Sequence, residues 1–177
     1  FLAGALTALD ARGVKAIGLD ILFDQRTDEA KDKALQAVLN GLGVPVIAAW
    51  ADKRDGLTDK QQAYLSDYLG KIARGYAGLR TDSRDGTMRW VDAGAGAEGV
   101  ETPGLAAAVA TAVGAVVPKG VMTLAYRPPP DQETTPFRIF PAHLVKVLPK
   151  VLLAGKIVIV GADLPLVDRF PTPMSVG

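Results

Sequence analysis

The sequence contains no cysteine and a single histidine, His143. The lack of cysteine excludes disulfides, zinc–thiolate sites, iron–sulfur clusters and thiol nucleophiles. One histidine cannot build a metal site from imidazole ligands, and its place at the start of an expected short helix is more typical of a surface or capping residue. Neither absence identifies the compartment, because cysteine-free domains occur on both sides of a membrane.

Motifs for nucleotide and covalent chemistry are also missing. The three serines lie outside any G-x-S-x-G elbow, and no Walker A loop is present. Residues 94–99 match G-x-G-x-x-G, but the next expected helix begins only at Thr102-Pro103, and no acidic residue follows between Glu101 and Asp131 to hold a ribose. We therefore predict a flexible loop at 94–99, no bound cofactor or metal, and no catalytic residue.

Charge and long apolar runs are equally modest. The 177 residues carry 20 Lys+Arg and 19 Asp+Glu, which gives a net charge of +1. Such a balance argues against a nucleic-acid partner and against a polybasic membrane-surface protein. The longest uncharged stretch, 102–118, is shorter than the about 20 residues that a spanning helix needs. We expect a buried helix there and no membrane span within this sequence.

The patterns that are present indicate an α/β fold. Nearly continuous apolar runs at 16–23, 44–50 and 156–161 are typical of strands covered on both faces, and segments with helical spacing of apolar residues separate them. Alternating strands and helices predict a mainly parallel sheet between helices. The length suits one domain over 1–177, with three layers.

One part of the sheet is expected to be antiparallel. The runs 73–80 and 88–91 flank the turn signal Asp82-Ser83-Arg84-Asp85-Gly86. We predict that these two runs pair as a hairpin, which makes the sheet mixed.

Carboxylates provide the candidate site. Of the 19 acidic residues 15 are aspartates, and most of them suit turns and caps. Asp20 differs because it lies inside an apolar strand, where we expect it to be buried; Asp24 follows that strand, and Asp163 and Asp168 follow the last strand. In parallel strands these side chains would gather at the carboxyl edge of the sheet, where open α/β sheets bind ligands.

Two interpretations of these carboxylates remain open. In the functional one they bind a cation or a polar ligand, or pair with Arg89 or Arg169. In the structural one Asp20 and Asp24 accept hydrogen bonds from loop amides, and Asp168 forms a pair close to Arg169.

Three segments and their order resemble a known family. They are 13–23, 82–89 and 155–161, and the last is followed by Asp168 and by Thr172-Pro173. This set is similar to the CHASE sensory family of the second type, whose acronym stands for cyclases/histidine kinases associated sensory extracellular. The resemblance covers essentially the whole chain. The residues that fit the family pattern are Asp20, Asp85, Gly86, Arg89, Gly161 and Asp168.

The resemblance implies the extracytoplasmic input domain of a bacterial membrane receptor. Such domains lie between transmembrane helices and are followed by a cyclase, kinase or similar output, so the domain itself is expected not to be an enzyme. Its stimulus would be a small molecule or a protein. Because these outputs generally work as dimers, we expect a homodimer, with part of the contact made by the helix that carries Leu2, Leu6 and Leu9.

Two other functions are considered beside the sensor. One is a metal-dependent hydrolase or phosphotransferase in which Asp20, Asp24, Asp163 and Asp168 hold Mg²⁺ or Ca²⁺. The other is a structural dimerisation or adaptor module that binds no small ligand.

Overall fold

A parallel sheet forms the centre of the computed structural model, which describes residues 1–92, 94–97, 100–128, 131, 136–162, 164 and 170–174. The sheet has four strands in the order β3-β2-β1-β8. Their bounds are Ala16–Asp20 for β1, Val46–Trp50 for β2, Ala73–Tyr76 for β3 and Ile157–Gly161 for β8. All three neighbouring pairs run parallel. The expected α/β class with a mainly parallel sheet is confirmed.

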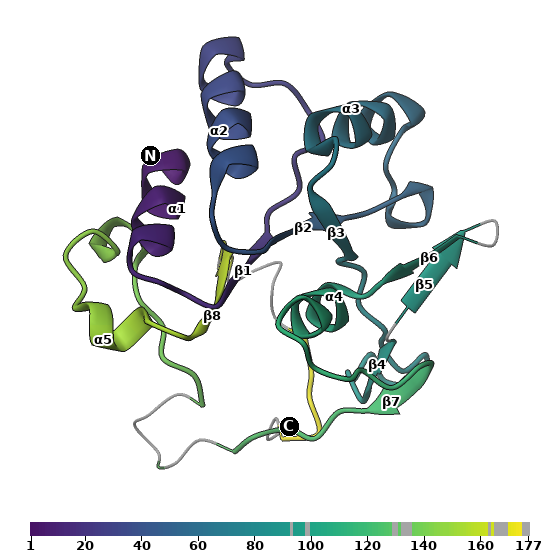
Figure 1. The fold of residues 1–177 in the computed structure, drawn as a ribbon. Coiled ribbons are helices and arrows are strands. Elements are labelled where there is room, and N and C mark those ends of the chain that lie inside the picture. The colour runs from purple at the N-terminus through teal and green to yellow at the C-terminus, as the bar shows by residue number, and fades with distance from the viewer. Residues whose placement is uncertain are drawn as a thin grey trace.

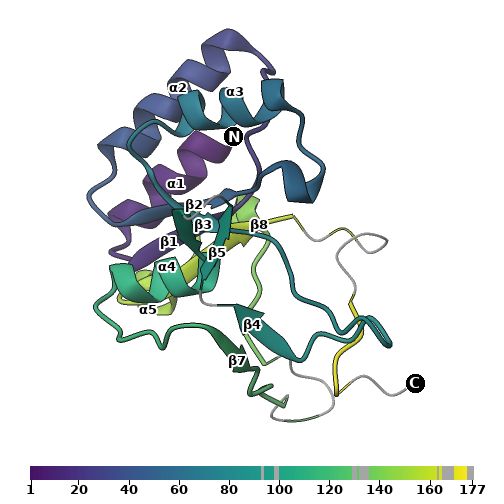
Figure 2. The same ribbon diagram turned by 90° about the vertical axis from the view of Figure 1, so that its right-hand side faces the viewer.

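Helices cover both faces of the sheet, as Figures 1 and 2 show together. One face carries α1, α2 and α3, and the other carries α4. Their bounds are Leu2–Ala11, Glu29–Gly41, Asp59–Leu69 and Leu105–Ala112, respectively. No helix among the described residues is long and apolar enough to cross a membrane.

The starts of α2 and α3 follow from local capping. The carboxylate of Asp28 accepts a hydrogen bond from the backbone N–H of Lys31 at 3.0 Å. Thr58 and Gln61 form a reciprocal capping box, in which each side chain accepts from the other's backbone N–H. Both caps satisfy N–H groups that a helix cannot pair internally.

The main core lies between the sheet and α1, α2 and α3. Leu6 and Leu9 of α1 are buried there with Ile17 and Leu19 of β1. The helical spacing of the leucines is confirmed, but their predicted place in a dimer contact is wrong, because these two side chains are inside the domain. A periodic apolar stripe indicates that a face is covered and does not indicate by what.

On the opposite face of the sheet, α4 packs very close to the strands. A Cβ on Gly75 of β3 would lie well inside van der Waals contact of the Leu105 Cα in α4, and one on Gly18 of β1 would lie 3.1 Å from a methyl carbon of Val109. Small residues on this face therefore let α4 rest directly on the strands. α4 leaves β8 partly uncovered, so Ile157 and Ile159 are 46% and 56% exposed. The expectation that this last strand is buried is therefore wrong on one face.

The remaining strands form two separate antiparallel ribbons. β4 (Trp90–Asp92) pairs with β7 (Val121–Thr123), and β5 (Gly94–Ala97) pairs with β6 (Val100–Pro103). The predicted hairpin between 73–80 and 88–91 is wrong, because Ala73–Tyr76 joins the parallel sheet beside β2.

Two further local predictions are corrected in this part of the chain. Gly94–Ala97 is a strand, not a flexible loop; its pairing with β6 supplies the order that its composition does not indicate. Thr102 and Pro103 belong to β6, and the helix begins after Gly104. Gly99, with Glu98, lies outside the described residues.

Three short helical turns complete the fold. They are η1 (Lys53–Asp55), η2 (Ala142–Leu144) and α5 (Lys150–Leu153). η2 is the expected short helix that contains His143, and Pro149 separates it from α5. Val145 and Leu153 are buried against the main core.

Candidate functional site

The chain reverses direction within the sheet at β1. From β1 it passes through α2 to β2 and through α3 to β3, moving to one side across the face that carries these helices. It returns through α4, on the other face, to β8 on the opposite side of β1. The carboxyl ends of β1 and β8 therefore flank a topological switch point, which is where open α/β sheets leave a crevice for ligands.

Asp20 lies at this switch point. It is the last residue of β1 and pairs in register with Gly161, the last residue of β8. The side chain is exposed, so the prediction of a buried carboxylate is wrong: β1 ends at Asp20, and the residue has emerged from between the helical layers. A Cβ on Gly161 would lie 3.2 Å from the Asp20 Cβ. Glycine at this position thus leaves space beside the carboxylate.

Asp24 has a structural partner. Its carboxylate accepts a hydrogen bond of 2.7 Å from Nε2 of Gln61, which lies in the first turn of α3. Gln61 also accepts from the backbone N–H of Thr58. Asp24 therefore ties the segment after β1 to the start of α3. The donor to Asp24 is therefore a side-chain amide rather than one of the expected loop N–H groups.

A polar network after β2 was not anticipated from the sequence. Nε and Nη2 of Arg54 donate to the two carboxylate oxygens of Asp52 at 3.0 and 2.7 Å. The Tyr76 hydroxyl, at the end of β3, donates to Asp55 at 2.8 Å, and the Arg54 guanidinium lies over the Tyr76 ring. The available signal was Asp52 directly after a buried strand, the same position that made Asp24 a candidate.

The ionisation of this network follows from its contacts. Hydrogen bonds from the Arg54 side chain, opposed in part by burial, lower the pKa of Asp52. Burial first, and the hydrogen bond to Asp55 second, raise the pKa of Tyr76 to about 12. Asp52 is therefore charged and Tyr76 neutral at physiological pH, and we call this ion-paired network after β2 the paired rim.

Arg89 is held within its own turn. It donates to both oxygens of Asp85 at 2.8 and 2.7 Å and to Asp82 at 2.8 Å. The hydrogen bonds from Arg89 are the main reason that the pKa of Asp85 lies far below its usual range. Arg89 is thus the partner of two carboxylates in its own turn. The same turn borders an open hollow of about 700 Å³ that Ser83, Arg84 and Trp90 also line.

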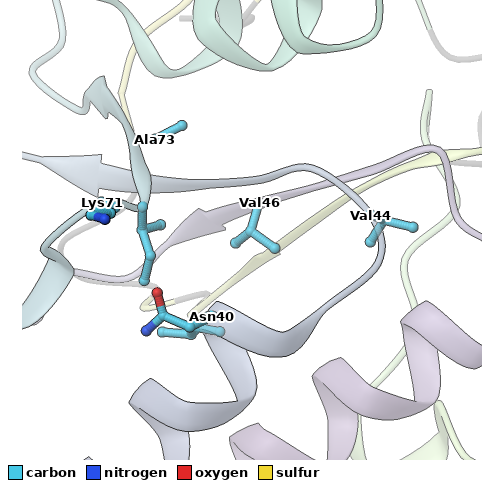
Figure 3. A pocket seen from close by; sticks show the side chains of 7 residues that line it. Asn40, Val44, Val46, Lys71 and Ala73 are labelled. Atoms are coloured by element: carbon cyan, nitrogen blue, oxygen red, sulfur yellow. The ribbon is translucent and has the colours of Figure 1, made fainter.

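A second hollow lies at the amino ends of the parallel strands, opposite to the edge that carries Asp20. It measures about 220 Å³ and is bordered by the C-terminal turn of α2 and the amino ends of β2 and β3 (Figure 3). Its lining is Leu39, Asn40, Val44, Val46, Lys71, Ile72 and Ala73. Asp20, Asp24 and Arg89, the predicted site residues that the structure describes, do not border it.

Of the four predicted aspartates, the structure describes Asp20 and Asp24, and these do not belong to a metal site. Within the ranges given above, no group of three or more His, Cys, Asp or Glu side chains is arranged to hold a metal ion. Asp163 and Asp168, and with them Arg169, lie outside those ranges. What the structure does confirm is the parallel neighbourhood of β1 and β8 on which their expected gathering depended.

The fold and the position of Asp20 define a doubly wound α/β module, and we call the carboxyl ends of β1 and β8 its ligand-type edge because open α/β sheets bind ligands there. The family model described as CHASE2 domain matches residues 1–176, so the chain belongs to the CHASE2 domain family. CHASE2 domains are sensory, non-catalytic modules of cyclase and kinase receptors and are generally extracytoplasmic. Searches among curated proteins and solved structures found no match.

Proposed function

We propose that this chain is the extracytoplasmic input domain of a transmembrane receptor and that its stimulus binds at the switch point between β1 and β8. The observation that carries the proposal is the exposed carboxylate of Asp20 beside Gly161. An unburied acid at a sheet edge suits a ligand that brings positive charge or hydrogen-bond donors, such as a divalent cation, an amine or a polyol.

Signal transmission requires the ligand to distinguish two states of the domain. A ligand shifts a conformational equilibrium only by the difference between its affinities for the two states. The carboxyl ends of β1 and β8 could make this distinction, because the two strands continue into different parts of the chain. A ligand that bridges the two strand ends would therefore favour one relative placement of these segments. Flanking membrane helices and pairing of two receptor copies complete the proposed relay.

The test is a thermal unfolding screen of the purified chain with divalent cations, amines, amino acids and polyols, with and without chelator. A ligand present at 100 times its dissociation constant adds about 2.7 kcal/mol to the free energy of unfolding, which raises the midpoint by several degrees. We expect a saturable shift with one class of compound. Asp20→Asn should abolish the shift, measured in each variant from that variant's own unliganded midpoint.

Asp67→Asn is the matched control, since Asp67 is an exposed aspartate in α3, away from the strand ends. It should leave the ligand shift intact. A shift that survives in Asp20→Asn would place the site elsewhere. If no compound produces a shift, the adaptor role becomes the better account.

A further inference from the structure

Residues 136–151 form one flank of the molecule beside α1, leading into α5 (Figure 1). We call this segment the basic flank. It is firmly attached: Val145 is buried, and Leu148 packs against the main core. Arg12 at the end of α1 donates to the backbone carbonyls of Leu148, at 3.0 Å, and of Lys146.

The basic flank exposes more apolar surface than its attachment requires. Phe137, Ile139, Val147 and Val151 are 69%, 75%, 74% and 80% exposed, and Phe140 and Leu144 are also exposed. Apolar side chains scattered singly over a surface are ordinary, whereas a contiguous apolar patch marks an interaction surface. The six exposed apolar side chains of this flank fall within residues 137–151, which favours the second case.

The charges of the same segment have one sign. Arg138, Lys146 and Lys150 are exposed, and no acidic residue occurs between Glu133 and Asp163. No carboxylate of the described part of the chain forms an ion pair with these three cations. The near-zero net charge of the whole chain thus conceals a segment in which every charged side chain is a cation.

We propose that the basic flank docks onto an anionic lipid surface, with its apolar side chains entering the headgroup region and its cations contacting lipid phosphates. Interfacial segments combine Phe and Leu-type side chains with Lys and Arg in this way. The lysines favour lipid over protein as the occupant, because lysine is depleted at protein–protein interfaces. The docking goes beyond the proposed sensory function and does not depend on Asp20.

The experiment is flotation of the purified chain with vesicles of phosphatidylcholine, with and without phosphatidylglycerol. We expect binding to the anionic vesicles, weaker binding at high salt, and little binding to phosphatidylcholine alone. Each cation near an anionic surface is worth about 1 kcal/mol, so the triple variant Arg138→Gln, Lys146→Gln, Lys150→Gln should bind about a hundredfold more weakly. The matched control Lys60→Gln, Lys71→Gln, Lys119→Gln removes the same charge elsewhere and should change binding far less.

A second pair of variants tests the apolar contribution. Val147→Ser with Val151→Ser should weaken binding, whereas Leu79→Ser with Val116→Ser, which alters exposed apolar residues outside the flank, should not. Equal losses in the charge variant and its control would overturn the proposal. So would equal binding to neutral vesicles, or no binding at all. A concentration-dependent dimer that Val147→Ser with Val151→Ser disrupts, in a chain that ignores vesicles, would assign the flank to a second copy instead.

Discussion

Residues 1–76 and residues 77–174 are built on different principles. The first part, the sheet region, contains three of the four strands of the parallel sheet with α1, α2 and α3, and it holds sixteen of the twenty buried apolar residues found in the described chain. The second part, the ribbon region, contains short antiparallel pairs and α4, and it carries all but one of the large exposed apolar side chains. The one exception is Phe1.

This difference suggests that the two regions have different roles, one in stabilising the fold and the other in contacting other molecules. The sheet region positions Asp20 and the paired rim after β2 on a well-packed base. The ribbon region places small residues against that base through α4 and exposes many of its larger apolar side chains. Stability should therefore depend mostly on the sheet region, and interactions with other molecules mostly on the ribbon region and on the strand ends.

The largest expected effect comes from emptying the main core. Leu6 is fully buried, so Leu6→Ala should lower the free energy of unfolding by about 2–5 kcal/mol through lost burial and a residual cavity. Val147→Ala, at an exposed position in the ribbon region, should stay within about 0.5 kcal/mol of the unaltered chain. Urea unfolding followed by tryptophan fluorescence measures both. Similar losses for the two variants would refute the division between the regions.

A smaller effect is expected where the two regions meet. Gly75→Ala places a methyl group against the backbone of Leu105, so α4 must shift, at a cost of about 1–3 kcal/mol. Gly41→Ala is the control: nothing lies within 4 Å of a Cβ there, and the residue ends α2. That variant should gain about 0.4–1 kcal/mol. If Gly75→Ala unfolds like the unaltered chain, α4 is not held as closely as described.

The smallest effect concerns acid stability of the turn that carries Arg89. The pKa of Asp85 is lowered in the folded chain, so this carboxylate stabilises the fold above its unfolded pKa of about 3.9 and ceases to do so as the pH falls toward its folded pKa. Arg89→Gln removes the cause and should flatten the decline of the thermal midpoint below pH of about 4. Arg84→Gln, in the same turn, should keep the steeper decline. An unchanged profile in Arg89→Gln would remove this pair from the acid response.

Local signals were sufficient where the determining contacts are near in sequence. Helix caps are contacts of this kind, because at Asp28 and Thr58 the side chain and the N–H from which it accepts are three residues apart. The apolar runs of β1 and β2 indicated strands because both faces of the central sheet are covered. The family pattern then agreed with the order of these elements.

Strand pairing, burial and ion pairing that depend on residues distant in sequence could not be predicted from local patterns. Residues 73–76 have the composition of either a hairpin arm or a parallel strand, and the free edge of β2 decided between them. Asp20 was expected to be buried because its neighbours in sequence are apolar, yet burial depends on where the helical layers end. Arg89 was assigned to the candidate site although two carboxylates in its own turn are close enough to bind it first.

The pairing of β1 with β8 also affects the order in which the molecule can be completed. Ala16 pairs with Ile157, so one edge of β1 stays bare until the last strand of the sheet has left the ribosome. β1, β2 and β3 can assemble much earlier, whereas closing so long a loop is slow and exposes an apolar strand edge meanwhile. The ligand-type edge, which needs both strand ends, therefore forms only when synthesis of the domain is nearly finished, and a shortened product would lack the proposed ligand edge.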